Sequence, residues 1–300
     1  MIYVMSKKSF GIAAIKHLYD VSFDFDISNI YLVNGFGFFF LAKNKHCIGL
    51  IKDNGEVIFP WVGDIDRSGT QDGIPATFTA PTSLCYSKNQ KSLFVIENNG
   101  KRIRKVYLEN KYVSMALEGK SLQKLNSFFA KLSFNTVVDC DIDKLDNIIW
   151  SVKDLNRVFR FCHDRHEIEV LIGDGRGDFN IVSKLSDCSI RLPIGVKYAD
   201  KSVLLCDSGN HCIRKISNNA IGVLVGNPTV SGDKDGVSTE CLLSYPCHPK
   251  YSSNMLYFID NQKVKQLSIS DKSVKSIRSF DSEVLIETEK RDLFMLEKTI

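Results

Sequence analysis

The densest group of potential metal ligands is the segment 162–166, which reads Cys-His-Asp-Arg-His. The thiol of Cys162 and the imidazoles of His163 and His166 could hold zinc, which prefers sulfur and nitrogen ligands. A structural zinc site needs a fourth ligand, and none lies close by in the sequence. We therefore expect no metal here and assign the segment to a surface hairpin between two strands.

Oxygen donors form a second group of candidates, because carboxylates and amides can hold calcium. Six such or related polar side chains fall on predicted inner strands: Asn29, Thr82, Asn135, Asp139, Asp141 and His248. They do not recur as one constellation, and no nucleophile with an adjacent base is evident. We therefore predict that the protein is not an enzyme and needs no cofactor. A metal-dependent hydrolase or lyase with a site in a central channel is an alternative, which a bound divalent ion would indicate.

Cations form a third group, which falls in polar turns between apolar strands. Its members are Lys43, Lys45, His46, Lys101, Arg102, Lys153, Arg157, His211 and Lys263. Gathered on one face, they could meet the phosphates of single-stranded RNA or an acidic protein. The net charge is only +4, from 39 basic and 35 acidic residues, and nucleic-acid-binding proteins usually have a stronger basic bias. We therefore predict a protein partner and keep RNA as an alternative.

These turns are positioned by a repeat. Aligned aliphatic positions occur at Ile48, Ile103, Val158, Ile213 and Val264, with separations of 55, 55, 55 and 51 residues. Glycines follow a short apolar strand at 63, 119, 173 and 226, with separations of 56, 54 and 53. Two markers with one period of this length, and several short strands in each unit, indicate the blades of a propeller.

The best-formed repeat resembles a known family. Residues 207–216 read Asp-Ser-Gly-Asn-His-Cys-Ile-Arg-Lys-Ile and are similar to the signature of NHL repeats, which build β-propellers. Residues 192–196, Leu-Pro-Ile-Gly-Val, resemble the inner strand of that family. Ala42 and Val152 stand where the family prefers Asp, so the signature turn is not expected in their two repeats. The resemblance covers nearly the whole chain and implies the fold; some members of the family bind single-stranded RNA.

Two arginines recur with the repeat. Arg104 and Arg214 directly follow the aligned aliphatic residue of their strands. We expect them to pair with acidic residues such as Glu97 and Asp207, because a charge repeated at one position is explained better by the repeat than by a single active site.

The expected fold is all-β: a six-bladed β-propeller of four-stranded antiparallel blades, with the ring closed by strands from both termini. Residues 283–288 and 292–297 offer two strands, and residues 2–5 and 12–18 offer two more, which together complete the sixth blade. We predict one domain over 1–300, with blades at about 28–63, 64–119, 120–173, 174–226, 227–279, and 280–300 completed by 1–27.

Cysteine usage indicates the compartment. The chain has nine cysteines, an odd number without a Cys-x-x-Cys pair, and most fall inside predicted strands. This pattern is typical of reduced, core-packed thiols rather than of a disulfide framework. The sequence shows neither a signal peptide nor a membrane-spanning stretch. We therefore expect a cytoplasmic scaffold without a membrane partner, and we hypothesise that it is a subunit of a larger assembly such as a viral or organellar particle.

Overall fold

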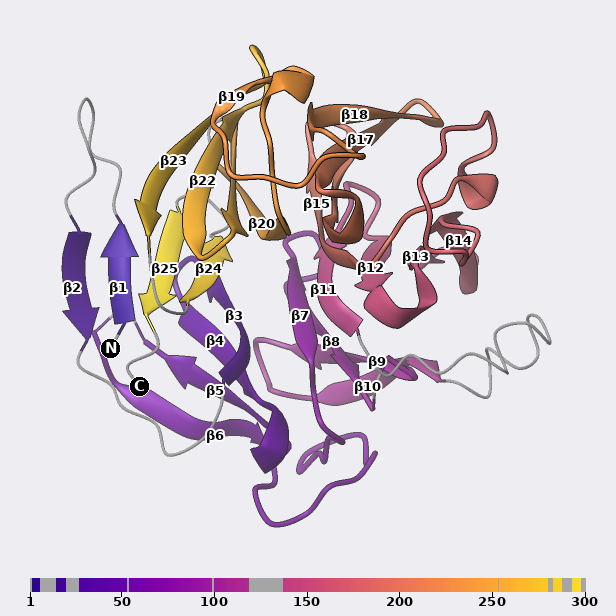
Figure 1. Cartoon of the computed structure of the whole chain (residues 1–300). Coiled ribbons are helices and arrows are strands. Elements are labelled where there is room, and N and C mark those ends of the chain that lie inside the picture. The colour runs from indigo at the N-terminus through magenta and orange to yellow at the C-terminus, as the bar shows by residue number, and fades with distance from the viewer. Residues whose placement is uncertain are drawn as a thin grey trace.

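The computed structural model describes residues 2–5, 15–19, 27–52, 54–98, 100–118, 137–252, 254–279, 283–287 and 293–297. Within these residues the fold is all-β, and antiparallel sheets are arranged like blades around a central axis (Figure 1). In the described part of the chain, no helix is long and apolar enough to span a membrane.

Each blade runs outward from an inner strand near the axis. The first three blades comprise β3 (Ile27–Val33), β4 (Gly37–Ala42), β5 (Cys47–Ile51) and β6 (Val57–Gly63); β7 (Ser83–Ser87), β8 (Ser92–Glu97), β9 (Arg102–Tyr107) and β10 (Val113–Glu118); and β11 (Val137–Ile142), β12 (Ile148–Val152), β13 (Arg157–Cys162) and β14 (Glu167–Ile172).

The last two blades follow the same order. Blade four comprises β15 (Pro193–Ala199), β16 (Ser202–Asp207), β17 (Cys212–Ser217) and β18 (Ala220–Gly226). Blade five comprises β20 (Cys247–Ser252), β21 (Met255–Asp260), β22 (Lys263–Ser268) and β23 (Ser273–Ser279), with the short β19 (Gly236–Val237) on its outer edge.

The prediction of six four-stranded blades is wrong: the described residues form five blades, and the fifth has five strands because β19 pairs with β23. Strands from the two chain ends, β1 (Ile2–Met5), β2 (Ile15–Tyr19), β24 (Glu283–Glu287) and β25 (Leu293–Glu297), do pair in the order β2-β1-β25-β24. Their side chains lie outside the described residues. The described residues establish strand pairing for this sheet. The face-to-face packing that makes a sheet a blade depends on side chains.

The core lies between the blades. On β8, Leu93 and Val95 pack against the first blade, whereas Phe94 and Ile96 pack against the third. This alternation follows from the period of two in a strand. Both faces of each inner strand pair are therefore buried, which explains why strands such as β4 are apolar at every position.

The repeated glycines end the fourth strands of their blades. Gly63, Gly173 and Gly226 have φ angles of +116°, +114° and +92°, which side-chain-bearing residues rarely adopt. A Cβ on Gly226 would lie 2.4 Å from the carbonyl oxygen of His211. The glycine repeat therefore exists because the end of the fourth strand passes against the turn between strands two and three. Gly119 lies outside the described residues.

Candidate functional site

Three of the predicted turns, in blades one, three and four, are hydrogen-bonded to the next blade. Short 3₁₀ turns, η1 (Lys43–Lys45), η2 (Lys153–Leu155) and η4 (Ser208–Asn210), each end at a left-handed residue, namely His46, Asn156 or His211. The N–H of Ala80 donates to His46 Nδ1 over 3.0 Å, and the N–H of Leu192 donates to Asn156 Oδ1 over 2.8 Å. His211 Nδ1 hydrogen-bonds the carbonyl of Ser244. These side chains act as clamps, that is, as hydrogen bonds that join one blade to the next across the seam between them.

The turn also forms where the signature residue is missing. Ala42 and Val152 replace the Asp of the repeat, yet η1 and η2 follow them with the same left-handed end as η4. The backbone geometry of the turn therefore does not depend on the acidic side chain. The acid is instead needed for a buried cation on the neighbouring strand.

Buried cations occupy one equivalent position in blades two, four and five. Arg104 and Arg214 are fully buried and lie 3.0 and 3.1 Å from the carboxylates of Glu97 and Asp207, which confirms the predicted pairs. In blade five the equivalent residue is Lys265, whose Nζ lies 3.5 Å from Asp260 and 2.7 Å from Asp233.

These cations also hold the long loops that enter their blades. Arg104 donates to the carbonyls of Gln71 and Thr77, at 2.8 and 3.0 Å. Arg214 donates to the carbonyls of Asn180 and Ser189, at 2.7 and 2.8 Å. Each loop is thereby fixed by charge-assisted hydrogen bonds from inside the protein.

Burial raises the pKa of the Glu97, Asp207 and Asp260 carboxyls, and the adjacent cation opposes this rise. An unpaired charge in such a place is costly. Blades one and three lack the acid, at Ala42 and Val152, and the equivalent cation position holds Gly49 or Phe159. Both partners are absent together, so neither blade has an unpaired member of this pair.

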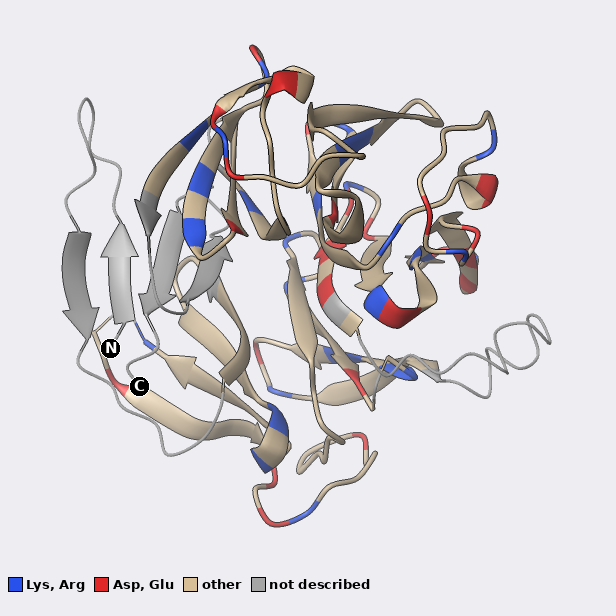
Figure 2. Ribbon diagram, viewed as in Figure 1, with Lys and Arg blue, Asp and Glu red and all other residues tan. Residues whose placement is uncertain are grey.

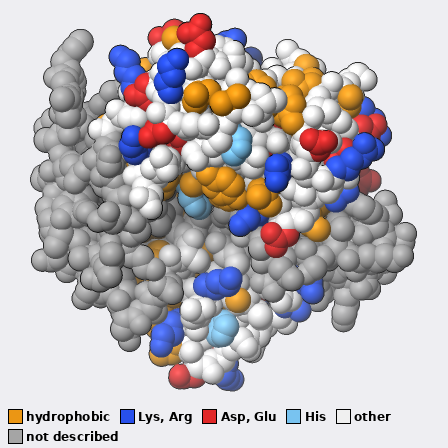
Figure 3. Space-filling view, in the orientation of Figure 1, with side chains coloured by type: hydrophobic (Ala, Val, Ile, Leu, Met, Phe, Trp, Pro, Cys, Tyr) orange, Lys and Arg blue, Asp and Glu red, His pale blue; other side chains and the backbone are white. Residues whose placement is uncertain are grey.

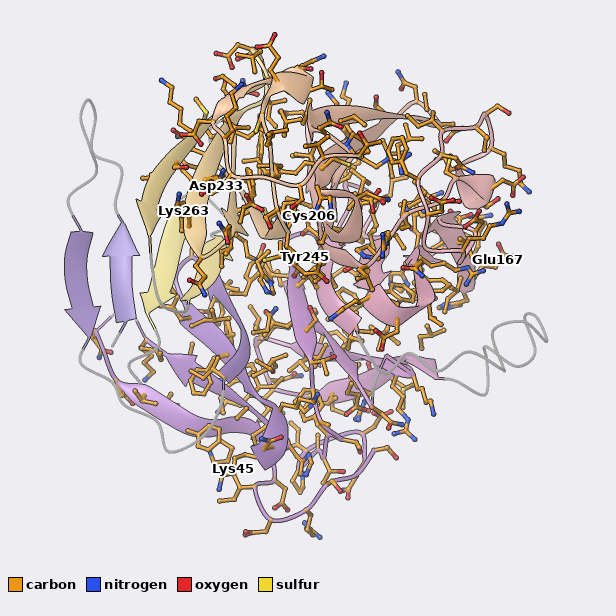
Figure 4. The ribbon with its side chains drawn as sticks, viewed as in Figure 1. Lys45, Glu167, Cys206, Asp233, Tyr245 and Lys263 are labelled. Atoms are coloured by element: carbon orange, nitrogen blue, oxygen red, sulfur yellow. The ribbon has the colours of Figure 1, made fainter. Side chains whose placement is uncertain are left out.

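Several of the predicted binding cations are engaged within the protein. Besides His46 and His211, Arg157 donates to the carbonyl of Asp174 over 2.7 Å, and Lys263 forms an ion pair with Asp233, toward which it points (Figure 4). The others, Lys43, Lys45, Lys101, Arg102 and Lys153, are exposed or half-buried in or beside the turns. They lie on blades one, two and three. Figure 2 shows Asp and Glu interspersed with Lys and Arg over the described blades.

The inner strands place acids and lysines close together near the axis. Lys197 Nζ lies 3.0 Å from Asp141, which also accepts the N–H of Tyr198 over 2.6 Å. Lys250 Nζ lies 3.9 Å from Asp139. Burial raises the pKa of Asp139, and the nearby Lys250 opposes this rise. Each acid thus has a lysine beside it, which favours internal neutralisation over a cation site.

The other predicted polar positions are less informative. Burial lowers the pKa of His248, which favours its neutral form. The hydroxyl of Thr82 donates to the carbonyl of Ile96 over 3.2 Å. Asn29 is half-buried on β3, and Asn135 lies outside the described residues.

The segment 162–166 forms the predicted hairpin between β13 and β14. The ring centroids of His163 and His166 are 5.9 Å apart, and both rings pack on Phe161. Arg165 donates to the sulfur of Cys162 over 2.9 Å. Among the described residues, no group of three or more His, Cys, Asp or Glu side chains is arranged to hold a metal ion.

Two features escaped the sequence reasoning. Exposed aliphatic side chains lie on the loops between blades, namely Ile65, Ile74, Ile181, Val182, Val230 and Val237; apolar side chains show at several separate places on this face (Figure 3). On the opposite face, lysines lie over aromatic rings of blade two and its neighbour. A bulky apolar residue inside a Gly- and Asp-rich loop is the signal that would have found the first feature.

The architecture and the inter-blade seams define the chain as a β-propeller protein. No family model and no curated protein sequence matches it. Solved β-propeller structures do. An auxiliary nutrient binding protein from Bacteroides thetaiotaomicron superposes with a TM-score of 0.58 at 12% identity, over 88% of this chain and 64% of that one. This chain thus spans less than two thirds of that protein.

Two further structures match over more of their length. Virginiamycin B lyase from Staphylococcus aureus has a TM-score of 0.56 at 13% identity, covering 97% of this chain and 85% of the lyase. A chain of the nidogen/laminin complex has a TM-score of 0.56 at 11% identity, covering 98% and 95%. The three are named as a nutrient binding protein, a lyase and a member of a complex, so at these identities the likeness shows the fold alone.

Proposed function

We propose that this chain is an NHL-type β-propeller that acts as a non-enzymatic binding platform for a protein partner within a larger assembly. The observation that carries the proposal is that long loops between the blades present aliphatic side chains while buried cations hold the backbone of these loops. Ile74 is 65% exposed, although Arg104 binds the carbonyls of the same loop at Gln71 and Thr77. A surface fixed in this way loses little conformational entropy on binding.

The NHL assignment rests on the repeated ion pair. Blade four keeps the whole signature in residues 207–216, and blades two and five keep an acid and a cation in the equivalent places. A nutrient binding protein and a chain of the nidogen/laminin complex share the fold, which fits a binding role.

The two alternatives have less support. RNA binding would use the cationic turns, but His46, Arg157, His211 and Lys263 are engaged within the protein. Channel chemistry would use the acids of β11, but each of these acids has a lysine beside it.

The cysteines support a reducing, cytoplasmic location. All nine are free thiols, and eight of them are buried. Burial raises the pKa of Cys47 and Cys247 to about 12, so these thiols stay protonated and unreactive.

The experiment is native affinity purification of the chain from its own cells, with and without ribonuclease, followed by mass spectrometry. We compare the wild type with the double variant Ile181→Asp/Val182→Asp. The matched control is Leu145→Asp, because Leu145 is 62% exposed but lies in the β11–β12 turn on the opposite face.

A protein that survives ribonuclease, binds the wild type and the control, and is lost from the double variant is the expected result. Partners that disappear with ribonuclease would move RNA binding to first place. Equal recovery by all three chains would refute the role of the loops.

A further inference from the structure

Lysines gather at the outer part of blade two, on the turns at the end of the blade opposite Lys101 and Arg102. The long loop that enters this blade reaches their border, where Gly73 pairs with Val113. The turns β7–β8 (88–91) and β9–β10 (108–112) lie side by side there, because the N–H of Leu108 donates to the carbonyl of Lys91 over 3.3 Å. Lys88, Lys91 and Lys111 are exposed on these turns, and Lys105 is half-buried beside them.

Two of these lysines are held over aromatic rings. Lys105 Nζ lies 4.5 Å from the ring centroid of Tyr107 and donates to Gln90 Oε1 over 2.6 Å. Lys111 Nζ lies 5.7 Å from the ring centroid of Trp61, which belongs to β6 of the first blade. Lys111 therefore lies at the seam between blades one and two, whereas Lys105, which is also 6.0 Å from the ring centroid of Phe94, faces the seam with blade three. The two ammonium groups border the same end of blade two, and their rings orient them before any partner arrives.

The backbone beneath the lysines is hydrogen-bonded. The N–H of Tyr107 donates to the carbonyl of Tyr112 over 2.9 Å, and the N–H of Lys111 donates to the carbonyl of Tyr107 over 2.9 Å. The rings of Tyr107 and Tyr112 lie 6.1 Å apart, and Tyr112 is 43% exposed. A phenol beside the lysines adds a hydrogen-bond donor that a carboxylate can use.

Few acids oppose these charges. Glu109 is the carboxylate on the two described turns. Asp146, from the neighbouring β11–β12 turn, accepts from the Ser87 hydroxyl over 2.8 Å and from Gln90 Nε2 over 3.2 Å, so its negative charge lies beside the β7–β8 turn and offsets part of the positive charge. The four lysines outnumber Glu109 and Asp146, and Lys91 and Lys111 among them are exposed.

We propose that Lys91, Lys105, Lys111 and Tyr112 form a docking surface for an acidic polypeptide segment, rich in Asp or Glu, of a protein partner. This inference rests on the proposed function as a protein-binding platform and adds a second contact surface with its own chemistry. A second class of polyanion, single-stranded nucleic acid, binds by stacking bases on open rings. Here Lys105 covers a face of Tyr107, and Trp61 is only 7% exposed under Lys111. These two rings are therefore in contact with lysines and are not open to stacking bases.

The test is fluorescence anisotropy of purified protein with a short labelled poly-L-glutamate, and with labelled oligouridylate of equal charge. Poly-L-glutamate binds the wild type, and at about 0.1 M salt the double variant Lys105→Ala/Lys111→Ala binds it roughly five- to tenfold more weakly, since an exposed ion pair contributes up to about 1 kcal/mol. Lys105→Arg/Lys111→Arg keeps the charge and retains binding. The control Lys101→Ala removes a lysine from the opposite face of the same blade and leaves the affinity unchanged.

Equal affinity of the wild type and the double alanine variant would overturn the proposal, as would the absence of poly-L-glutamate binding. Tighter binding of oligouridylate than of poly-L-glutamate would overturn the class of partner and assign the surface to nucleic acid. The Ile181→Asp/Val182→Asp chain binds poly-L-glutamate like the wild type. A failure of the loop face in cells is therefore distinguishable from a failure of this surface.

Discussion

Arg214 is the residue whose removal tests most directly how the loops are held. Its guanidinium is fully buried, lies 3.1 Å from Asp207, and donates to two carbonyls of the loop that enters blade four. Arg214→Met keeps much of the side-chain volume but removes the charge. Breaking a buried ion pair from one side costs about 3–5 kcal/mol, and the carbonyls left without a donor raise this cost. Asp207 keeps bonds from Asn210 and from the Arg191 N–H, so we expect a loss of about 4 kcal/mol in the free energy of unfolding.

The assay is equilibrium unfolding in urea, with the midpoint and the slope both measured. Burial already raises the pKa of Asp207, and without Arg214 the pKa rises further. A carboxyl whose folded pKa is raised is most favourable when protonated, so the deficit of the variant shrinks as the pH falls. The double variant Arg214→Met/Asp207→Asn recovers part of the lost stability at neutral pH. A loss below about 1 kcal/mol, the size of an exposed pair, would refute the reasoning, and so would a double variant as unstable as the sum of the single ones.

Three further predictions concern the seams and the loops. Gly226→Ala lowers the free energy of unfolding by about 1–3 kcal/mol, because the backbone at Gly226 has a positive φ. Gly222→Ala has open space at its Cβ and changes the free energy of unfolding by less than about 0.5 kcal/mol. Calorimetry of both variants tests this difference. Asn156→Ala removes a clamp to the next blade and costs about 1 kcal/mol, which urea unfolding would measure. Hydrogen bonding from Lys263 is the largest cause that lowers the pKa of Asp233 from 3.8 to about 2. The ion pair of Asp233 with Lys263 therefore stabilises the fold above pH 3.8, and this stabilisation is lost as the pH falls toward 2. NMR titration should show this midpoint, and Lys263→Met should raise it; an ordinary midpoint in the wild type would contradict the ion pair.

The sequence predicted the blade pattern because the repeat is enforced by local sterics and by strand alternation. A glycine is required wherever the fourth strand meets the turn, as at Gly226, and a buried arginine requires an acid, as Arg104 requires Glu97. The number of blades was wrong, because strand patterns at the chain ends say nothing about whether a sheet packs as a blade.

The functional surfaces were harder to predict. His46 and His211 appeared as exposed cations in a linear sequence, since their hydrogen-bond partners belong to the next blade. The lysine–aromatic surface combines Lys111 with Trp61 from another blade, and no local pattern reports such a pair.

The seams differ in how they respond to temperature. Blades two, four and five contain a buried ion pair at the equivalent position, whereas blades one and three have stacked aromatic rings there, Phe40 with Phe59 and Trp150 with Phe159. The cost of removing charges from water falls on heating, and hydrophobic stabilisation weakens on cooling. Cooling would therefore weaken the packing of blades one and three first. Heating would raise the relative contribution of the ion pairs in blades two, four and five, so the blades of one propeller differ in their response to temperature.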